Sequence, residues 1–299
     1  MKKDYTNNLF KNSTFRHLRL PFSFFLLPVF LFAVSQSDPI DWQHAFIAFI
    51  ILHLLIFPSS NGYNSYQDKD ESSIGGLKHP PKVTKNLYYV TLLMDVAGIG
   101  CALFISVYFA ILVLIFILVS RAYSYRKLRL KKYAVIGFLT VFIFQGAFVY
   151  LMTTVAISSV SLIHFFTMNH IICMSIASLF IGSIYPLTQI YQHESDKKDG
   201  VISISYKLGY IGTFVFSGIL FSIATLLLFY YFSLKHQPIV LILFVVIILP
   251  AAYYLTAWFN KVRSNTVHAN FENTMKMNML TSICMNLYFT ILIFINFLP

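Results

Sequence analysis

Charged residues are scarce in this sequence. Only 11% of its 299 residues are charged, and the 11 acidic residues are half as many as the 22 basic ones. A chain with so few charges and 58% hydrophobic residues cannot cover itself with polar surface, which excludes a water-soluble globular domain. Cysteine is also rare. Because Cys101, Cys173 and Cys284 lie in apolar segments without metal-type spacing, we expect packing residues and no disulfide framework.

Long apolar runs are what the sequence has in abundance, and its mean hydropathy is +0.71. A helix needs roughly 20 apolar residues to cross a bilayer, whereas barrel strands would alternate polar and apolar residues. The runs therefore predict an all-α integral membrane protein with nine transmembrane helices, in two four-helix halves plus one around a central cavity. We predict a basic cytoplasmic segment over 1–19 and a single transmembrane domain over 20–298. The predicted helices are 20–35, 41–58, 86–103, 105–120, 133–155, 168–187, 208–232, 238–258 and 278–298.

The distribution of basic residues supports this helix count. The apolar stretch 86–120 is too long for one crossing, and we divide it around 100–104. With nine helices and the N-terminus inside, every Lys and Arg except Lys235 falls on the inner side, as the positive-inside rule requires. The net charge of +11 then reflects topology and attraction to anionic lipid, not nucleic-acid binding. We expect a bacterial cytoplasmic membrane, with the C-terminus outside.

The first 35 residues have a second interpretation. A basic region precedes an apolar run, and Ala33-Val34-Ser35 is similar to the small residues of a signal-peptidase site. A cleaved secretory signal is therefore the alternative to a first transmembrane helix.

Two polar segments interrupt the apolar sequence, at 61–85 and at 188–207. We expect both to be cytoplasmic loops, after the second and sixth helices, that face each other across one cavity. Their oxygen-bearing side chains are of the kind that binds Mg²⁺ together with substrate phosphate, although they can equally be solvated loop charges. These side chains are Asn64, Asp68, Asp70, Glu71, Glu194, Asp196 and Asp199.

Four short motifs follow one another along the chain: 64–68 (NSYQD), 123–131 with Tyr123-Ser124 and LRLK, Gln145-Gly146, and 192–200 (QHESDKKDG). In this order and at this spacing they resemble the UbiA superfamily of intramembrane prenyltransferases. Residues 64–68 (NSYQD) stand at the place of the Asn-Asp-x-x-Asp run of that family. Residues 192–200 (QHESDKKDG), followed by Leu208-Gly209, are similar to its Asp-x-x-x-Asp-x-x-x-Gly run. Tyr123-Ser124 before 128–131 (LRLK), and Gln145-Gly146 in the fifth helix, extend the likeness over nearly the whole chain.

The resemblance implies Mg²⁺-dependent transfer of a polyprenyl group from an isoprenoid diphosphate to an aromatic or other lipophilic acceptor within the membrane. Asp68, Asp196, Asn64, Glu194 and Asp199 are then the expected metal ligands. Asp68 and Asp196 also have catalytic roles, as do Tyr123 and Lys131. The expected substrate-binding residues are Asn64, Lys78, Asp95, Lys127, Arg129 and Gln192.

The chain departs from the family pattern at two positions. Ser65 and Gln192 stand where each motif normally begins with Asp. Two missing carboxylates lower the negative charge and weaken Mg²⁺ binding unless Asp70, Glu71 or Asp199 compensates. This departure keeps open a non-catalytic relative that binds isoprenoids or other lipids.

Several residues allow a structural as well as a functional interpretation. The basic run 121–132 is expected to anchor the chain at the membrane, and the alternative, which is compatible with it, assigns Lys127, Arg129 or Lys131 to diphosphate contacts. Lys78 either reaches phosphate or is solvated. Asp95 lies inside a predicted helix and either orients an acceptor or packs through hydrogen bonds. His53, His164 and His170 have no partner at ligand spacing and are expected to be structural. The 31 Phe and 19 Tyr suit an isoprenoid tunnel but also ordinary membrane helices.

A secondary transporter is a further alternative, because two related halves are common among transporters. Transporters place polar groups or broken helices near the middle of the membrane, whereas this chain concentrates its polarity near the cytoplasmic side. The sequence therefore favours the transferase.

Overall fold

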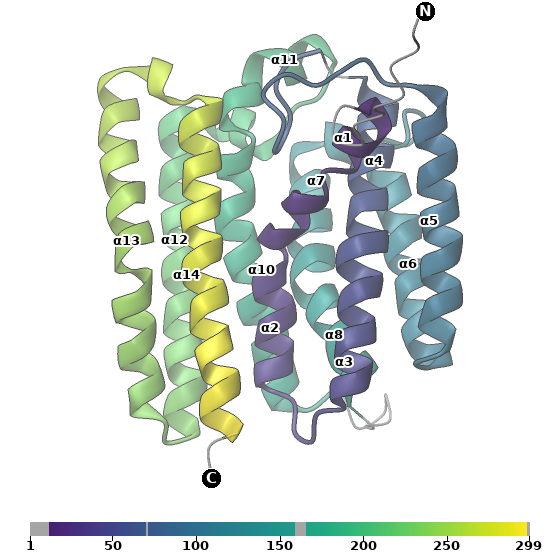
Figure 1. Ribbon diagram of the computed structural model, residues 1–299. Helices are drawn as coiled ribbons and strands as arrows, with labels where there is room; N and C mark the ends of the chain where they lie inside the picture. Colours follow the sequence, from purple (N-terminus) through teal and green to yellow (C-terminus); the bar gives the residue numbers. More distant parts are fainter. Residues whose placement is uncertain (1–11, 70, 159–165, 298–299) are drawn as a thin grey trace, which may run out of the picture. The chain divides into compact units, whose positions relative to one another are not determined.

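The computed structural model describes residues 12–69, 71–158 and 166–297, and these are helical apart from turns, loops and one isolated β-bridge between Ile74 and Leu77 (Figure 1). His164 and Asp70 lie outside the described residues. The main elements are α1 (Ser13–Leu18), η2 (Leu20–Phe25), α2 (Leu27–Ser35), α3 (Trp42–Ile50), η3 (Ile51–Ile56), α4 (Phe57–Asp68), α5 (Lys85–Leu103), α6 (Val107–Ser124), η4 (Leu130–Lys132), α7 (Ala134–Val141), η5 (Phe142–Ala147), α8 (Phe148–Ile157), α10 (Met168–Thr188), η6 (Ile190–Gln192), α11 (His193–Lys198), α12 (Ile204–Leu234), α13 (Pro238–Ser264), η7 (Thr266–His268) and α14 (Phe271–Phe297).

The helices are long and apolar enough to cross a membrane many times. Among the described residues there are eight such spans, or nine if Ser13–Phe25 and Leu27–Ser35, which meet at a bend of 40°, form one. The protein is thus an all-α, multi-pass membrane protein, as the sequence predicts. The predicted division of 86–120 is confirmed, because α5 ends at Leu103 and α6 begins at Val107. The Ser106 side chain caps α6 by accepting a hydrogen bond from the Phe109 N–H over 3.1 Å.

The expectation that both polar segments are loops is wrong for their motif-bearing parts. The span that begins at Trp42 stays helical to Asp68 and ends where Lys69 adopts a left-handed φ of 55°. Residues Ile190–Lys198 are helical in the second segment. Hydropathy detects only the part of a helix that lies in lipid, and a helix can continue into water when its polar turns pack against neighbours.

The chain folds into two compact units. The first consists of Met1–Ser23 and Phe49–Arg129, and the second of Phe24–Ala48 and Leu130–Pro299. In the first unit, α4, α5 and α6 pack against one another and α1 packs on α4 and α5 (Figure 1). Gly62 permits this packing, since a Cβ atom there would lie 2.8 Å from a methyl group of Thr91 on α5.

The short helix α1 holds the loop that follows α4. The Arg16 guanidinium donates to the His79 carbonyl over 3.0 Å, and the His17 ring lies 2.7 Å from the Pro81 carbonyl. Arg19 donates to the carbonyls of Gly75 and Asn61, each over 3.1 Å. These bonds tie α1 to α4 and to the loop after it, and those to Gly75, His79 and Pro81 satisfy loop carbonyls that no regular hydrogen-bond ladder satisfies.

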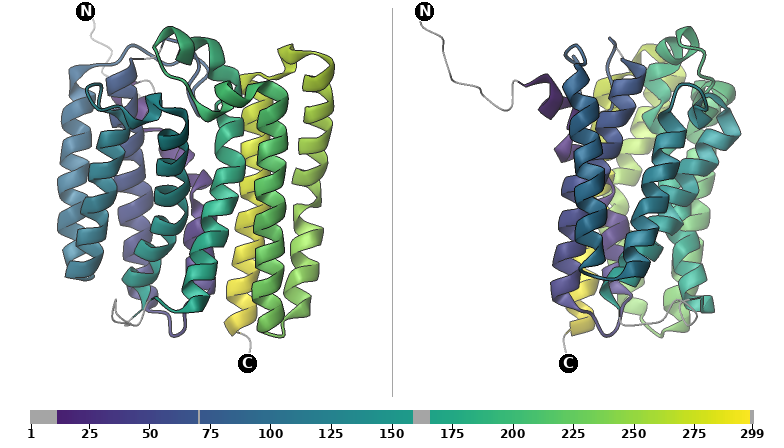
Figure 2. Two further views of the ribbon diagram at one scale, coloured as in Figure 1. Left: turned by 180° about the vertical axis from the view of Figure 1, so that it is seen from behind. Right: turned by 90° about the vertical axis from the view of Figure 1, so that its right-hand side faces the viewer.

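In the second unit, α10 packs on α12 and η5, α13 packs on α14, and α2 packs on α14 and α8. Helix α12 also runs beside α13 (green and yellow-green in Figure 2, left). Gly146 in η5 lets its helix approach α10 closely, because a Cβ atom there would lie only 2.7 Å from the Ser178 backbone nitrogen. The Ser178 hydroxyl accepts a hydrogen bond from the Ala147 N–H over 2.9 Å at the same contact.

Candidate functional site

The first motif forms the last turns of α4, and its Asp is buried. The Asp68 side chain is 3% exposed, and its Oδ1 atom accepts a hydrogen bond from Nη2 of Arg129 over 3.1 Å. Arg129 is also buried, with its side chain 10% exposed, and its φ of 44° lies in the left-handed region. The two residues are 61 positions apart in the chain, so the backbone after α6 must turn back to make this pair.

Arg126 and Ser124 hold the same turns of α4 from the side of α6. The Arg126 guanidinium donates to the backbone carbonyls of Gln67 over 2.7 Å and Asp68 over 3.1 Å. These carbonyls belong to the end of a helix, where cations are favoured. Asn64 donates from its Nδ2 atom to the Ser124 hydroxyl over 3.0 Å, which leaves Oδ1 as the acceptor side of its amide. Asn64, Asp68 and Arg129 are therefore brought together within one unit.

The second motif lies in η6 and α11 of the other unit. Asp196 and Gln192 are half-buried, whereas Glu194 and Asp199 are exposed. The Asp196 carbonyl accepts the Val201 N–H over 2.8 Å and closes the turn after α11. Since Asp68 and Asp196 belong to different units, the predicted meeting of the two motifs across one cavity stays a prediction.

Buried polar side chains support this second motif. His193, which is next to Glu194, contacts the Ser205 hydroxyl through Nε2 at 2.8 Å and stacks on the Tyr210 ring with centroids 4.8 Å apart. Ser205 in turn lies 3.0 Å from the Thr213 hydroxyl. Gly209, with a φ of 68°, interrupts the helical backbone between Ser205 and Thr213. This network anchors α11 to α12.

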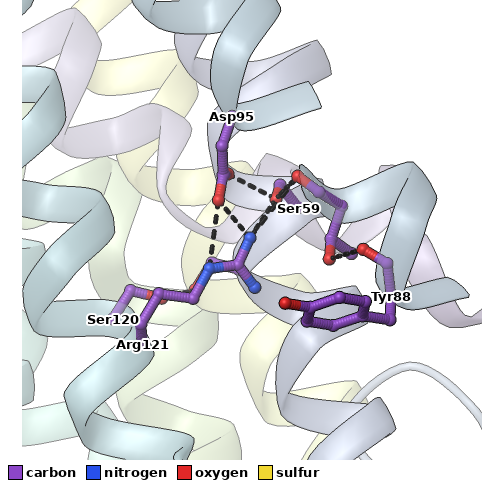
Figure 3. Close-up of polar contacts among 7 residues, drawn as sticks. Ser59, Tyr88, Asp95, Ser120 and Arg121 are labelled. Atoms are coloured by element: carbon purple, nitrogen blue, oxygen red, sulfur yellow. Dashed lines mark hydrogen bonds and ion pairs between the residues drawn. The ribbon is translucent and has the colours of Figure 1, made fainter. Parts of the chain in front are cut away.

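Asp95 is buried and forms an ion pair with the half-buried Arg121, between α5 and α6 (Figure 3). Both Nε and Nη2 of Arg121 bond to its Oδ2 atom, and the Ser59 hydroxyl lies 2.6 Å from Oδ1. Nη2 of Arg121 also contacts the Ser59 hydroxyl at 3.0 Å, and the guanidinium lies 4.0 Å from the ring centroid of Tyr63. Arg121, expected in a cytoplasmic loop, is instead in the last turn of α6, which runs to Ser124.

The remaining predicted residues are less enclosed. Tyr123 is half-buried on α6, and Lys127 is exposed in the loop after it. Lys131 is half-buried in η4 of the second unit. Lys78 is exposed, and its backbone carbonyl accepts a hydrogen bond from the Ser73 hydroxyl over 2.8 Å. His53 is buried between the rings of Phe49 and Phe57.

Sequence reasoning identified the motif residues but not the side chains that bind to them. It assigns Arg126 only to a membrane anchor, and it does not pair Arg121 with Asp95. One signal was available: a charged residue inside a membrane helix is expected to have an opposite charge nearby. Applied to Asp95, that rule points to Arg121, which lies on the next helix.

The donor atoms near Asp68 fit Mg²⁺ in kind, because this ion takes one or two carboxylates together with amide oxygens, water and substrate phosphate. Asp68 offers a carboxylate and Asn64 an amide oxygen. Within neither unit do the described residues place three His, Cys, Asp or Glu side chains close enough to hold a metal by themselves. A cation at this site would therefore need oxygen ligands from beyond Asp68 and Asn64.

Comparison with known proteins decides the family. A model of the UbiA prenyltransferase family matches residues 22–280. The chain belongs to this family. A search of curated proteins gives no match.

Solved structures share the UbiA fold over nearly the whole chain. A UbiA homolog from Archaeoglobus fulgidus bound to GPP and Mg²⁺ is 17% identical, with a TM-score of 0.65 over 94% of this chain and 99% of that one. The apo UbiA homolog from Aeropyrum pernix K1 is 15% identical, with a TM-score of 0.67 over 95% and 98%. A digeranylgeranylglyceryl phosphate synthase is 20% identical, with a TM-score of 0.58 over 94% and 96%. At these identities the similarity establishes the fold.

Proposed function

We propose that this protein transfers a polyprenyl group from an isoprenoid diphosphate to a lipophilic acceptor within the membrane, with Mg²⁺ as cofactor. The observation that carries the proposal is the buried Asp68, held by Arg129 at the end of α4, in a chain of the UbiA family. The Archaeoglobus fulgidus homologs bound to GPP or DMAPP with Mg²⁺ support it, because the same fold holds allylic diphosphates there.

The reaction breaks the bond between the allylic carbon and the diphosphate oxygen. The electron pair leaves with the diphosphate, and the acceptor forms a new bond to the allylic carbon and loses a proton. Bound Mg²⁺, held by Asp68 and Asn64 from the first unit and Asp196, Glu194 or Asp199 from the second, would neutralise charge on the diphosphate.

The chain's own cations and hydroxyls have separate roles in the proposal. Arg129, Lys127, Lys131 and Lys78 would bind diphosphate oxygens and stabilise the charge that develops on the leaving group. The Tyr123 hydroxyl would orient the donor. Asp95 is assigned no contact with substrate, because its carboxylate is already bound by Arg121 and Ser59.

The decisive experiment measures binding of a labelled long-chain prenyl diphosphate to the protein in nanodiscs. Binding should occur with Mg²⁺ and fall with excess EDTA, and it should weaken in Asp68→Asn and Asp196→Asn. Asp41→Asn is the matched control, because Asp41 is an exposed carboxylate that pairs only locally, with His44 at 3.1 Å. Wild-type binding that is as strong with EDTA as with Mg²⁺ would remove the metal from the proposal.

A second candidate is a protein that binds isoprenoid lipids without catalysing transfer. The observation in its favour is that Asp68 already has a cationic partner in Arg129, while Ser65 and Gln192 replace acidic motif positions. This candidate predicts binding that survives EDTA and no product with any acceptor. The transferase predicts binding that EDTA reduces and product formation with a suitable acceptor.

We also propose the orientation that the basic residues favour, with the N-terminus in the cytoplasm and the C-terminus outside, in a bacterial cytoplasmic membrane. Introduced cysteines test it. A membrane-impermeant thiol reagent applied to intact cells should label Lys235→Cys, and it should not label Lys127→Cys until the membrane is opened.

A further inference from the structure

A cavity of about 170 Å³ lies within the second unit, lined by residues of α10, α12, α13 and α14. Its walls include Ser183, Ser217, Gly218, Ala251, Thr256 and Thr281. Thr256 is exposed, as is Ser222, which also lines the cavity, so the cavity is accessible from the surface of its unit. None of the residues assigned to diphosphate or metal lines it.

Small side chains create this space. Gly218 on α12 and Ala251 and Ala252 on α13 line the cavity, and a Cβ atom built at Gly218 would meet no atom within 4 Å. Small residues normally let membrane helices approach closely. Gly146 allows such a close approach to α10, whereas at Gly218 no neighbouring atom fills the position of a Cβ. The cavity is therefore a feature of this helix packing and not a consequence of glycine alone.

Four of the hydroxyl groups around the cavity fall into two classes. Ser183 donates to the Phe180 carbonyl over 2.7 Å, and Thr256 donates to the Ala252 carbonyl over 2.9 Å, each within its own helix. Ser217 and Thr281 are buried, 1% and 8% exposed, and their hydroxyls have no hydrogen-bond partner among the described residues. A buried hydroxyl without a partner is unfavourable, most of all in a membrane helix. Two of them, on α12 and α14, line the same cavity.

The side chains that line the cavity also determine which charge its ligand can carry. Of the described residues that line the cavity, none is charged, and most are apolar or small. A diphosphate or an ammonium ion would be desolvated there without a counter-charge. The ligand must therefore be neutral and largely apolar, with a polar atom for the Ser217 and Thr281 hydroxyls.

We propose that this cavity binds one neutral, ring-sized alcohol, with the ring against the apolar wall and its hydroxyl bonded to Ser217 and Thr281. The size follows from comparison, since an apolar protein cavity of about 150 Å³ is known to hold one benzene molecule. This site is additional to the diphosphate site and does not rest on the proposed transferase activity.

Photolabelling in nanodiscs tests the proposal. The probe is a cyclohexanol that carries a diazirine, and the comparison probe is the same molecule without the hydroxyl. After irradiation, mass spectrometry should find the cyclohexanol label on peptides containing 217–222, 251–256 or 277–281. The hydrocarbon probe lacks the hydrogen bonds to both Ser217 and Thr281, so it should label these peptides at least about fivefold less.

Two matched pairs of variants assign the label to the cavity. Gly218→Leu places a side chain into the open space and should abolish labelling. Gly100→Leu should leave labelling unchanged. Gly100 is a helical glycine on α5, and a Cβ atom built there also meets no atom within 4 Å. Ser217→Ala should reduce labelling by the alcohol about fivefold. Ser183→Ala, whose hydroxyl is satisfied within its own helix, should leave it unchanged.

Three outcomes would overturn the proposal. Equal labelling by both probes would show partition into apolar space without recognition of a hydroxyl. Equal labelling of wild type and Gly218→Leu would place the probe outside the cavity. No labelling of these peptides at any probe concentration would indicate that the cavity holds only water. Thermal unfolding of each variant confirms that a loss of label does not reflect a loss of fold.

Discussion

Arg129 and Asp68 form a buried ion pair at the end of α4, with Nη2 and Oδ1 3.1 Å apart. Each residue has an expected role of its own, as diphosphate contact and metal ligand. Their pairing means that the two roles are coupled, because a cation or diphosphate that engages one of them changes the electrostatic surroundings of the other.

Replacement of either motif carboxylate should abolish prenyl transfer. We expect Asp68→Asn and Asp196→Asn each to lower kcat by about 100-fold or more, because each removes charge that stabilises the leaving diphosphate. Radiolabelled product formation with a panel of acceptors measures this. Asp41→Asn should retain full activity. Full activity in either motif variant would remove that residue from the mechanism.

The Arg129–Asp68 pair should also contribute to stability. Arg129→Gln leaves a buried carboxylate without its cation and should lower the free energy of unfolding by about 3 kcal/mol. The double variant Asp68→Asn/Arg129→Gln should recover part of this loss, since both charges are then absent. Unfolding in mixed detergent micelles measures these values.

Lys127→Gln serves as the control for this pair, because Lys127 is exposed in the same loop and its loss should leave stability unchanged. If Arg129→Gln and Lys127→Gln have the same free energy of unfolding, the buried pair makes no net contribution to stability.

The pair between Asp95 and Arg121 should be structural. We expect Asp95→Asn and Arg121→Gln each to destabilise the protein by about 3 kcal/mol, and the double variant to lose less than the sum. Any Asp95→Asn protein that stays folded should bind prenyl diphosphate as wild type does, because Asp95 has no proposed contact with substrate. A loss of binding in folded protein would instead assign Asp95 to the substrate site.

Gly146 should be intolerant of substitution. Gly146→Ala forces a methyl group against the Ser178 backbone on α10, and we expect a loss of about 1–3 kcal/mol in the free energy of unfolding. Gly100→Ala meets no atom within 4 Å, so alanine's better helix propensity should make it neutral or stabilising by about 1 kcal/mol. Equal behaviour of the two variants would show that α10 and η5 adjust to the added methyl group.

The sequence by itself determined the class of protein, the order of the family motifs and, to within one, the number of membrane spans, since nine are predicted and the described residues hold eight or nine. The class of protein and the number of spans depend on hydropathy and charge summed over short windows, and lipid imposes such patterns on any membrane chain. The division of 86–120 into two helices is an example, because its length exceeds one crossing and charge asymmetry supports the split, and the structure places the break at 104–106.

Only the tertiary structure decided which polar side chains are partners. Asp68 meets Arg129 and Asp95 meets Arg121 across helices, at separations of 61 and 26 residues that no local window covers. The tertiary structure also decided the cavity lined by Ser217 and Thr281. It forms only because four helices pack around Gly218 without filling the space beside it. Helix packing depends on the shapes of surfaces that are distant in sequence, so these contacts become visible only when the chain is folded.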